Sequence, residues 1–524
     1  MRTRALRRVR SPGPAVLRVR HASAGALVFL RGRDADGRAR ELVGQRARVR
    51  PVLAELAIAL LAGRRYEALG FRSLGDWSRE RLGVGARIVR EWARVGRALA
   101  ELPRLRRAVL SGEVSWTVAR KVVAHATPEN EEAVLATVRG RSVQAVEILL
   151  RAAFPSERAT TADDERVSVR VRCSPEVSTK WVAALELARR VAGESLPTWE
   201  CAEAIAAECA SVLPAVENGR PHAGHRSRRR APQARDKWGL RACVWPHLRW
   251  RGAAPRASDP LERLTRDLES CSPRALDRRF RRAIAFLQEV DFEIGRVLRQ
   301  VVDRKLYQEL GFESFERYVT ERLDLSRRTA GRLVRLARAE HRAPPVASAF
   351  RAGRITLLQA EVLLREGGAE VSVERAQQVT LRRLEDELPE RKVEFRAPQE
   401  VAALFLALVR SVGLEAMLDH ALATWLEAGR AFRDYADFER DGFRCTVPAC
   451  SARQNLQSHH IRFRSAGGPD VPWNRTTLCV FHHGRGVHTG LIGIRGRAPD
   501  ELIYELGVGT YRSGDLLAHE LSVR

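Results

Sequence analysis

The feature that most constrains the fold of this chain is an internal repeat. Residues 66–82 read YEALGFRSLGDWSRERL, and residues 307–323 read YQELGFESFERYVTERL. The two stretches lie 241 positions apart, and this spacing holds without a gap as far as Gly112 and Gly353. Identical pairs are Tyr66/Tyr307, Leu69/Leu310, Gly70/Gly311, Phe71/Phe312, Ser73/Ser314 and Glu80/Glu321. A match of this length indicates duplication, so the chain is expected to contain two units of one kind.

Both copies are predicted to be helical. In the second copy, Ser326 is placed to cap a helix, and apolar residues follow it at helical spacing. Pro103 and Pro344 break the helical pattern at matching places. Each copy then continues into a short strand with alternating apolar residues, at 167–172 and 393–396, and into a further helix.

At 524 residues the chain is too long for one core, and we expect several domains in a mainly α protein. Its predicted parts are a basic, disordered tail (1–50), a first helical domain (51–210), a basic linker rich in Pro, Gly and Arg (211–258), a second helical domain (259–430) and a small C-terminal domain (431–524).

The charge of the chain favours a polyanionic partner, and DNA is the expected one. The net charge is +27, and the 91 basic residues include only five Lys, so 86 are Arg. A high-GC genome would explain the choice of Arg over Lys, but not the excess of base over acid. Residues 1–50 and 220–256 carry +11 and +10, whereas 431–524 hold twelve Arg against ten acids. The tail and the linker are therefore expected to supply most of the attraction to DNA.

Two further segments have two interpretations each. Trp238, Trp245 and Trp250 lie among basic linker residues and could stack on bases, but such Trp residues more often attach a linker to a neighbouring domain. Residues 323–339 could form a helix-turn-helix with an Arg-bearing second helix. We favour an ordinary amphipathic helix there, because charged runs on helices are usually solvated.

No membrane partner or small-molecule substrate is expected. The apolar run at 53–63 is interrupted by Glu55 and is too short to cross a bilayer. The eight Cys are too sparse for a secreted disulfide framework, and a reducing cytoplasm is the expected location.

A dense group of Cys and His lies near the C-terminus. Three Cys and five His fall between Cys445 and His488, in a chain with only 8 Cys and 13 His. The pairs Cys445-x4-Cys450 and Cys479-x2-His482 have the spacing of a tetrahedral structural zinc site. The alternative is that these are isolated core cysteines.

The residues between these pairs follow the pattern H-H-I-x5-G-G-x5-N-x4-C-x2-H-H, from His459 to His483. This pattern resembles the HNH endonuclease family, and the resemblance covers about residues 435–505. The helical copies look like the helical region that precedes HNH domains in many bacterial proteins. The resemblance implies two helical repeat domains followed by a small zinc-stapled ββα-metal (HNH) nuclease domain.

Carried over residue by residue, the resemblance also implies roles. His459 and His483 would bind the catalytic divalent cation, Mg²⁺, Mn²⁺ or similar. His460 would be the general base, and Asn474 would brace the loop and orient that base. His488 matches a family position that contacts metal or phosphate, although four residues separate it from His483 where the family more often has three.

The same residues suit phosphodiester hydrolysis on chemical grounds. The reaction needs an activated water and a cation that stabilises charge on the phosphate. Imidazole takes up a proton near neutral pH, and adjacent residues of a strand point to opposite faces, so His459 and His460 can have different tasks. Arg462, Arg464 and Arg485 are candidate phosphate ligands, although each also fits an ordinary surface Arg.

The sequence thus predicts a metal-dependent DNA endonuclease. The alternative is a non-catalytic zinc-containing DNA-binding protein of a mobile element or a regulator, which would need the four zinc ligands but not His460 or Asn474. In a further alternative, the helical region 51–430 binds a protein partner and the nuclease acts as its effector.

Overall fold

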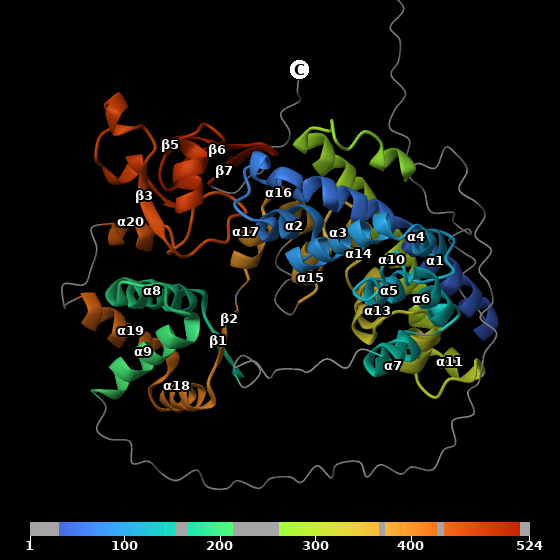
Figure 1. Cartoon of the computed structure of the whole chain (residues 1–524). Coiled ribbons are helices and arrows are strands. Elements are labelled where there is room, and N and C mark those ends of the chain that lie inside the picture. Colours follow the sequence, from blue (N-terminus) through green and yellow to red (C-terminus); the bar gives the residue numbers. More distant parts are fainter. Residues whose placement is uncertain are drawn as a thin grey trace, which may run out of the picture.

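The computed structural model describes residues 31–141, 143–153, 166–212, 261–365, 372–388, 390–426 and 434–513. The chain is mainly helical, with small two- and three-stranded sheets, as predicted (Figure 1). No single helix in these ranges is long and apolar enough to span a membrane. Helices α18 (Gln399–Val412) and α19 (Leu414–Trp425), which meet at a bend of 102°, reach that length and apolarity only as a pair.

Three helices of the first copy begin and end at positions that match three helices of the second. The first copy contains α1 (Gly32–Leu61), α2 (Leu74–Leu82), α3 (Ala86–Glu101), α4 (Pro103–Leu110), α5 (Trp116–Val122), α6 (Glu131–Val138) and α7 (Val143–Ala153). The second contains α10 (Pro273–Asp303), α11 (Leu306–Glu309), α12 (Phe315–Arg317), α13 (Arg327–Arg342), α14 (Pro344–Arg351), α15 (Leu357–Leu363), α16 (Val373–Gln378) and α17 (Leu381–Asp386). Helices α3, α4 and α5 are separated from α13, α14 and α15 by 241 positions at both ends.

The prediction of a disordered tail is wrong for residues 32–50, which belong to α1. Ala35, Ala39 and Leu42 are fully buried, and they recur at the spacing of one helix face. The high density of Arg made this segment look solvated and concealed that periodicity. Arg is nevertheless compatible with a packed helix, because its stem can cover apolar surface while its head stays in water. Residues 1–30 and, apart from residues 211–212, the predicted linker 211–258 lie outside the described residues.

The two long helices α1 and α10 pack against each other, and each contributes to both copies. The first part of α1 lies in the core of the second copy, beside Val297 and Tyr318. Its last part lies in the core of the first copy, beside Trp77. Helix α10 does the reverse, with Leu276 and Phe280 in the core of the first copy. The copies are therefore exchanged across these helices and do not form the separate domains predicted at 51–210 and 259–430.

Two equivalent sets of polar contacts hold the exchanged helices. Asp277 of α10 accepts hydrogen bonds from Arg81 Nη2 at 2.7 Å and from Trp77 Nε1 at 3.0 Å. Asp36 of α1 is bound by Arg322 Nη2 at 2.9 Å. Both carboxylates are buried, and an Arg of the opposite copy neutralises each.

The ends of the two copies also form one joint unit, at the lower left of Figure 1. It contains β1 (Val167–Cys173), α8 (Pro175–Ala192), α9 (Thr198–Ala210), β2 (Arg391–Ala397), α18 (Gln399–Val412) and α19 (Leu414–Trp425). Strands β1 and β2 pair in antiparallel register, centred on Arg170 opposite Glu394. The two strands predicted from alternation are thus confirmed, and they complete one two-stranded sheet with one strand from each copy.

Helix α13 decides between the two interpretations of residues 323–339, a helix-turn-helix or an amphipathic helix. Ala330, Leu333, Val334 and Ala337 are buried, and α13 packs closely on α10. Ser326 caps the helix by accepting a hydrogen bond from the backbone of Thr329, as predicted. The segment is therefore an amphipathic helix of the helical core.

The C-terminal unit contains α20 (Tyr435–Arg440), β3 (Leu456–His460), β4 (Arg475–Cys479), a π-helical turn (Phe481–Val487), β5 (Gly493–Arg497), β6 (Glu501–Leu506) and β7 (Gly509–Arg512). Strands β3 and β4 form an antiparallel pair, and β5, β6 and β7 form a three-stranded sheet that sequence analysis did not predict. The unit contacts the first helical copy closely, since a Cβ on Gly507 would lie 2.4 Å from the carbonyl oxygen of Ala68.

Candidate metal centres

Cys445, Cys450, Cys479 and His482 form one buried cluster that could hold a metal such as zinc. One ligand atom of each residue lies within 4.8 Å of the others. Nδ1 of His482 is 3.4 Å from Sγ of Cys445 and from Sγ of Cys479. Three thiols and one imidazole are a donor set of tetrahedral zinc sites. The two pairs predicted from spacing therefore converge, and the alternative of isolated core cysteines is wrong.

The electrostatics of this cluster favour the ligand form of one cysteine, Cys479. Hydrogen bonds from Cys445 and Cys450 lower the pKa of Cys479 far below its usual value, although burial opposes this. The hydrogen bonds of Cys450 to Cys445 and Cys479, together with burial, raise the pKa of Cys450 well above its usual value. Burial alone would lower the pKa of His482, but the Cys445 and Cys479 sulfurs outweigh it and raise that pKa to about 10. The cluster thus stabilises thiolate, the form of Cys that binds metal, at Cys479.

A backbone carbonyl of the first helical copy orients His482. Nε2 of His482 lies 3.1 Å from the carbonyl oxygen of Gly70, which leaves Nδ1 of His482 directed at the sulfurs of Cys445 and Cys479. Gly70 has a left-handed φ of 87°, and a Cβ there would lie 3.0 Å from the Leu506 side chain. The repeat residue Gly70 therefore permits close approach of the C-terminal unit and supplies an outer contact to the metal cluster.

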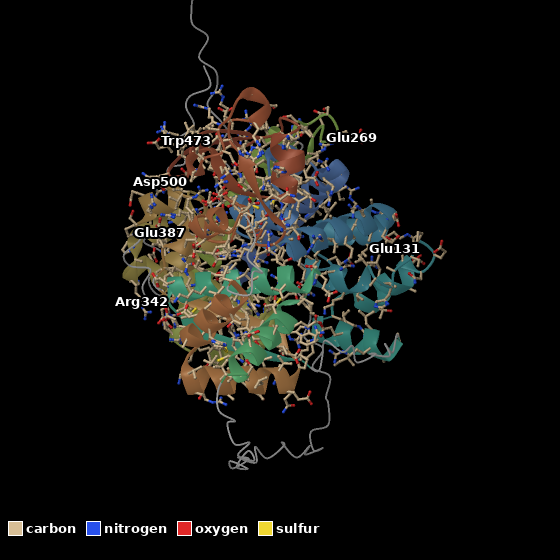
Figure 2. The ribbon with its side chains drawn as sticks, turned by 90° about the vertical axis from the view of Figure 1, so that its left-hand side faces the viewer. Glu131, Glu269, Arg342, Glu387, Trp473 and Asp500 are labelled. Atoms are coloured by element: carbon tan, nitrogen blue, oxygen red, sulfur yellow. The ribbon has the colours of Figure 1, made fainter. Side chains whose placement is uncertain are left out.

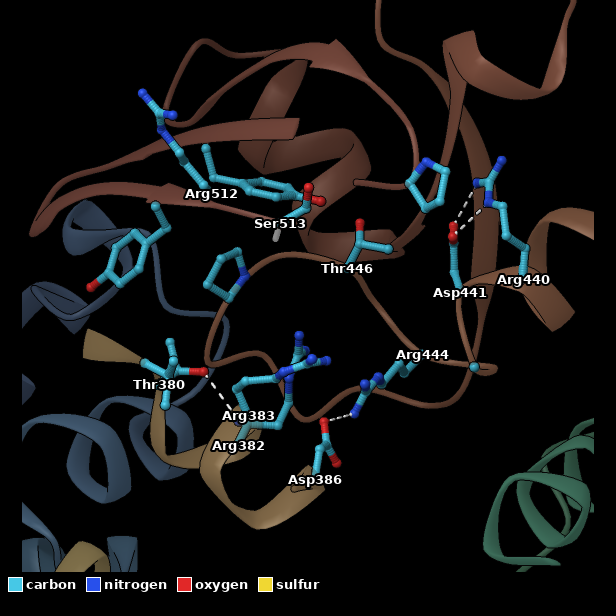
Figure 3. Close-up of a pocket in the computed structure, with 16 residues that line it drawn as sticks. Thr380, Arg382, Arg383, Asp386, Arg440, Asp441, Arg444, Thr446, Arg512 and Ser513 are labelled. Atoms are coloured by element: carbon cyan, nitrogen blue, oxygen red, sulfur yellow. Dashed lines mark hydrogen bonds and ion pairs between the residues drawn. The ribbon is translucent and has the colours of Figure 1, made fainter. Parts of the chain in front are cut away.

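The second helical copy contacts the same cluster from the other side. Nη1 of Arg382 donates to the carbonyl oxygens of Cys445, Val447 and Cys450, at 2.9, 3.2 and 2.6 Å. A cavity of about 270 Å³ adjoins this arginine, between α17 and the C-terminal unit (Figure 3). Two ion pairs visible in Figure 3 lie along its wall, Arg444 with Asp386 and Arg440 with Asp441.

A second cluster contains His459, His483 and His488. One ring nitrogen of each lies within 4.8 Å of the others. Nε2 of His459 is buried and has no hydrogen-bond partner. Burial, together with the neighbouring imidazoles, lowers the pKa of His459 to about 4, and burial also lowers the pKa of His483. The structure thus brings His488 together with the two predicted ligands.

The donor set of this second cluster fits a divalent cation. Neutral imidazole is the form that coordinates metals, and the lowered pKa values of His459 and His483 favour it. A buried nitrogen without a partner is costly, and coordination would satisfy Nε2 of His459. These three residues are therefore the ones that could hold a catalytic metal.

His460 points away from this cluster, as expected for the next residue of a strand. Its Nε2 lies 3.0 Å from Oδ1 of Asp470, and 18% of its side chain is exposed. Nη1 of Arg475 is 3.3 Å from the same oxygen. Sequence analysis missed Asp470 because it fell among the five unspecified positions before Asn474. A carboxylate within reach of a proposed base was the available signal.

Asn474 is buried and braces the loop between the two strands. Its Oδ1 accepts a hydrogen bond from the Arg462 backbone at 2.9 Å, and its Nδ2 donates to the carbonyl oxygens of Arg462 and Pro469 at 3.1 and 2.9 Å. The bracing role implied for Asn474 agrees with these contacts. The side chain that contacts His460 directly, however, is Asp470.

The three candidate phosphate ligands differ in their surroundings. Arg485 pairs with Glu67 of the first copy at 3.0 Å, and Nε of Arg462 donates to the carbonyl oxygen of Ala466. Arg464 lies exposed in the same loop. Arg485 is thus engaged in a contact between the C-terminal unit and the first helical copy, and Arg462 is engaged within its own loop. Arg464, which is exposed, is therefore the best placed of the three to bind a phosphate.

Two exposed aromatic residues near the second cluster were missed. Phe463 is 37% exposed and stacks on His488, with ring centroids 5.2 Å apart. Trp473, labelled near the edge of the molecule in Figure 2, is 38% exposed, and Arg497 lies over its ring. Large exposed aromatic side chains next to a polar site are typical of ligand-binding surfaces.

Scans against protein-family models, curated proteins and solved structures found no match to this chain.

Proposed function

We propose that this chain is a metal-dependent DNA endonuclease whose catalytic unit is the segment 456–488. The observation that carries the proposal concerns strand β3, whose two faces present His residues with different contacts. His459 joins two further imidazoles and leaves a buried nitrogen without a partner, while His460 is paired with Asp470. The order of strand, braced loop, strand and helical turn agrees with the ββα-metal unit that the resemblance to HNH endonucleases implies.

In this proposal, His459, His483 and His488 hold the divalent cation. When bound, the cation supplies stabilisation of the charge that develops on the phosphate and the leaving oxygen. Asp470 holds a proton on Nε2 of His460, which leaves Nδ1 as the basic nitrogen. His460 can then take a proton from the attacking water, and Asn474 keeps the loop between them in place.

DNA is the proposed substrate because of charge and surface chemistry. The chain carries +27, and of its two most basic segments, 220–256 and residues 1–30 of the segment 1–50 lie outside the described residues. Close to the three-histidine cluster, exposed Arg464 and Phe463 offer a cation for phosphate and a ring for stacking. The Cys445, Cys450, Cys479 and His482 cluster is proposed to bind structural zinc and to hold this unit on both helical copies.

The proposal is tested by nicking of supercoiled plasmid by the full-length protein with Mg²⁺ or Mn²⁺. Wild type and the control His341→Ala, an exposed residue of α13, should convert the plasmid to open circles. His460→Ala should lower the rate by about a hundredfold or more. Equal rates for wild type and His460→Ala would contradict the proposal.

A binding measurement separates the non-catalytic alternative. Fluorescence anisotropy with a labelled duplex at two salt concentrations reports binding by charge, because phosphate contacts weaken as salt rises. Salt-sensitive binding by a wild-type protein that nicks nothing with any divalent metal would favour a zinc-containing DNA-binding protein.

A further inference from the structure

A cavity in the helical body is separate from both metal clusters. It lies between α1, the α4–α5 region of the first copy and residues 322–324 of the second, and its volume is about 240 Å³. Most of its wall is apolar, and Val43, Val114 and Trp116 contribute to it. A concave, mostly apolar space with a few polar groups in its lining is typical of a small-molecule site.

Because of the internal repeat, this cavity can be compared with the equivalent site 241 positions away in the chain. Every lining residue has a counterpart 241 positions away, and several counterparts are larger. The cavity residue and its larger counterpart are Gly44 and Ala285, Ala47 and Gln288, Val109 and Phe350, and Val114 and Ile355. The same local fold therefore occurs twice, and at these four positions the second site has the larger side chain. Trp116 and Asp324 of the cavity are instead larger than their counterparts, Leu357 and Gly83.

The large side chains fill the counterpart position. Nε2 of Gln288 is buried and donates to the carbonyl oxygen of Ile355 at 2.9 Å. Phe350 is buried, and a Cβ on Gly353 would lie only 2.6 Å from the Cβ of Ala285. In the first copy these fillers are absent from α1, and the space remains. Missing core volume lowers stability, so a gap that the other copy fills indicates a site kept open.

The polar groups of the cavity indicate the charge of a ligand. Nε of Arg40 is buried and has no hydrogen-bond partner, and the nearest carboxylate oxygen, on Asp36, is 3.8 Å away. Arg48 and Arg322 also line the cavity, together with the carboxylate of Asp324. Asp36 binds Arg322 at 2.9 Å. The three guanidinium groups therefore exceed the carboxylates of Asp36 and Asp324 by one positive charge, which favours an anion.

Asp324 is itself unusual. It has a left-handed φ of 55°, whereas its counterpart is Gly83, which adopts the same region at φ 65° without strain. Its carboxyl group is hydrogen-bonded by Ser115, and burial raises its pKa to about 6. A strained non-glycine residue placed in the wall of a cavity is more typical of a binding site than of a packing position.

We propose that this cavity binds a small amphipathic anion. Its apolar body would lie against Val43, Val114 and Trp116, and its carboxylate, sulfonate or similar head group would lie at Arg40. The site does not depend on the proposed nuclease function, because its lining residues belong to the helical copies alone.

The test uses the full-length protein and anilinonaphthalene sulfonate, a fluorescent probe with an aromatic body and one anionic group. Wild type should bind one probe per chain with saturable fluorescence. The variant Gly44→Ala/Ala47→Gln copies the filled counterpart into α1 and should weaken binding by about tenfold or more. Val109→Phe fills the cavity from the side opposite α1 and should weaken binding of the probe to a similar extent. The control Ala285→Gly/Gln288→Ala alters the counterpart and should retain the wild-type site.

A neutral analogue, N-phenyl naphthylamine, tests the role of charge. Arg40→Gln should weaken binding of the sulfonate by about tenfold and leave the neutral analogue nearly unaffected. Thermal unfolding identifies which of the filled variants retain the wild-type fold. The proposal is overturned if wild type shows no saturable binding, or if a folded filled variant binds the sulfonate as tightly as wild type.

Discussion

Asp36 and Asp277 occupy equivalent positions in the two long helices, and an arginine of the opposite copy binds each of them. The pairing is reciprocal, so neither copy can complete its own core without the other. The helical body therefore has the arrangement of an exchanged dimer made within one chain. A fragment intended to test whether the helical region binds a protein partner should begin near residue 31, because residues 35–42 belong to the core of the second copy.

Asp277→Ala should lower the free energy of unfolding by about 3 kcal/mol. The substitution leaves the guanidinium of Arg81 and the indole N–H of Trp77 without their buried acceptor. Asp36→Ala should have a similar effect through Arg322. Urea unfolding monitored by circular dichroism measures both. Changes below about 0.5 kcal/mol would mean that the exchange contacts are not important for stability.

Gly96→Ala should destabilise the first copy, and a second substitution should restore it. A Cβ on Gly96 would lie 2.9 Å from the Cβ of Ala54. The second copy has the opposite arrangement, with Gly295 at the position of Ala54 and Ala337 at that of Gly96. We expect Gly96→Ala to cost about 1–3 kcal/mol, and the double variant Ala54→Gly/Gly96→Ala to recover most of it. The melting temperatures of the three proteins decide this.

Cys479→Ser should remove bound zinc and destabilise the C-terminal unit. Its thiol lies in the buried four-residue cluster, whereas Cys173, half-exposed in β1, lies outside it. Elemental analysis of purified wild type and Cys173→Ser should give about one zinc per chain, and Cys479→Ser clearly less. Equal zinc contents in the two variants would be evidence against the cluster as the zinc site.

Asp470→Asn should slow plasmid nicking by about tenfold to a hundredfold without unfolding the protein. An amide cannot neutralise the His460 imidazolium that forms when the base takes up a proton, and the Asp470 carboxylate, 3.0 Å away, can. An unchanged rate would exclude a role for Asp470.

Glu80 should make the protein less stable as pH rises from about 5 to 8. Burial raises its pKa from 4.5 to about 7, although the Leu381 backbone N–H, 2.9 Å from its Oε2, favours the charged form. The folded state therefore holds this proton more tightly than the unfolded state, and the stabilisation is lost as pH passes through the folded pKa. Because Glu80 is partly exposed, we expect a loss of only about 1–2 kcal/mol.

Glu80→Gln provides the control, since a neutral amide cannot lose this proton. Between pH 5 and pH 8, the free energy of unfolding of Glu80→Gln should fall less than that of wild type. The difference between the two decreases should be about 1–2 kcal/mol, the contribution expected from Glu80. Parallel pH profiles for the two proteins would show that Glu80 does not titrate in this range.

The elements that could be predicted are those whose signal is local. The helices after Ser326 and before Pro344 follow from a cap, a period and a breaker, and the strands 167–172 and 393–396 follow from alternation. The four-residue cluster that could hold zinc follows from the spacing of two Cys- and His-containing pairs. Each of these signals lies within a few residues along the chain.

What could not be predicted depends on contacts between distant segments. The pairing of β1 with β2 joins residues more than two hundred positions apart, and no local pattern specifies it. The Gly70 carbonyl at His482 and the three carbonyl oxygens at Arg382 are likewise long-range contacts of ordinary residue types. Asp470 was within reach of local reasoning, but a carboxylate in a loop has no distinctive periodicity.

The two copies provide two equivalent places where a C-terminal unit could attach, and the described residues contain one such unit. Gly70 is covered by Leu506, whereas its counterpart Gly311 has a similar left-handed φ and open space around it. Asp76, which binds Ser451 of the C-terminal unit, is replaced by Arg317 in the second copy. The described part of the molecule thus has one C-terminal unit attached to a helical body with two equivalent halves. Under the proposed function, this part of one chain carries one cutting centre, and simultaneous incision of both strands of a duplex by such centres requires two chains.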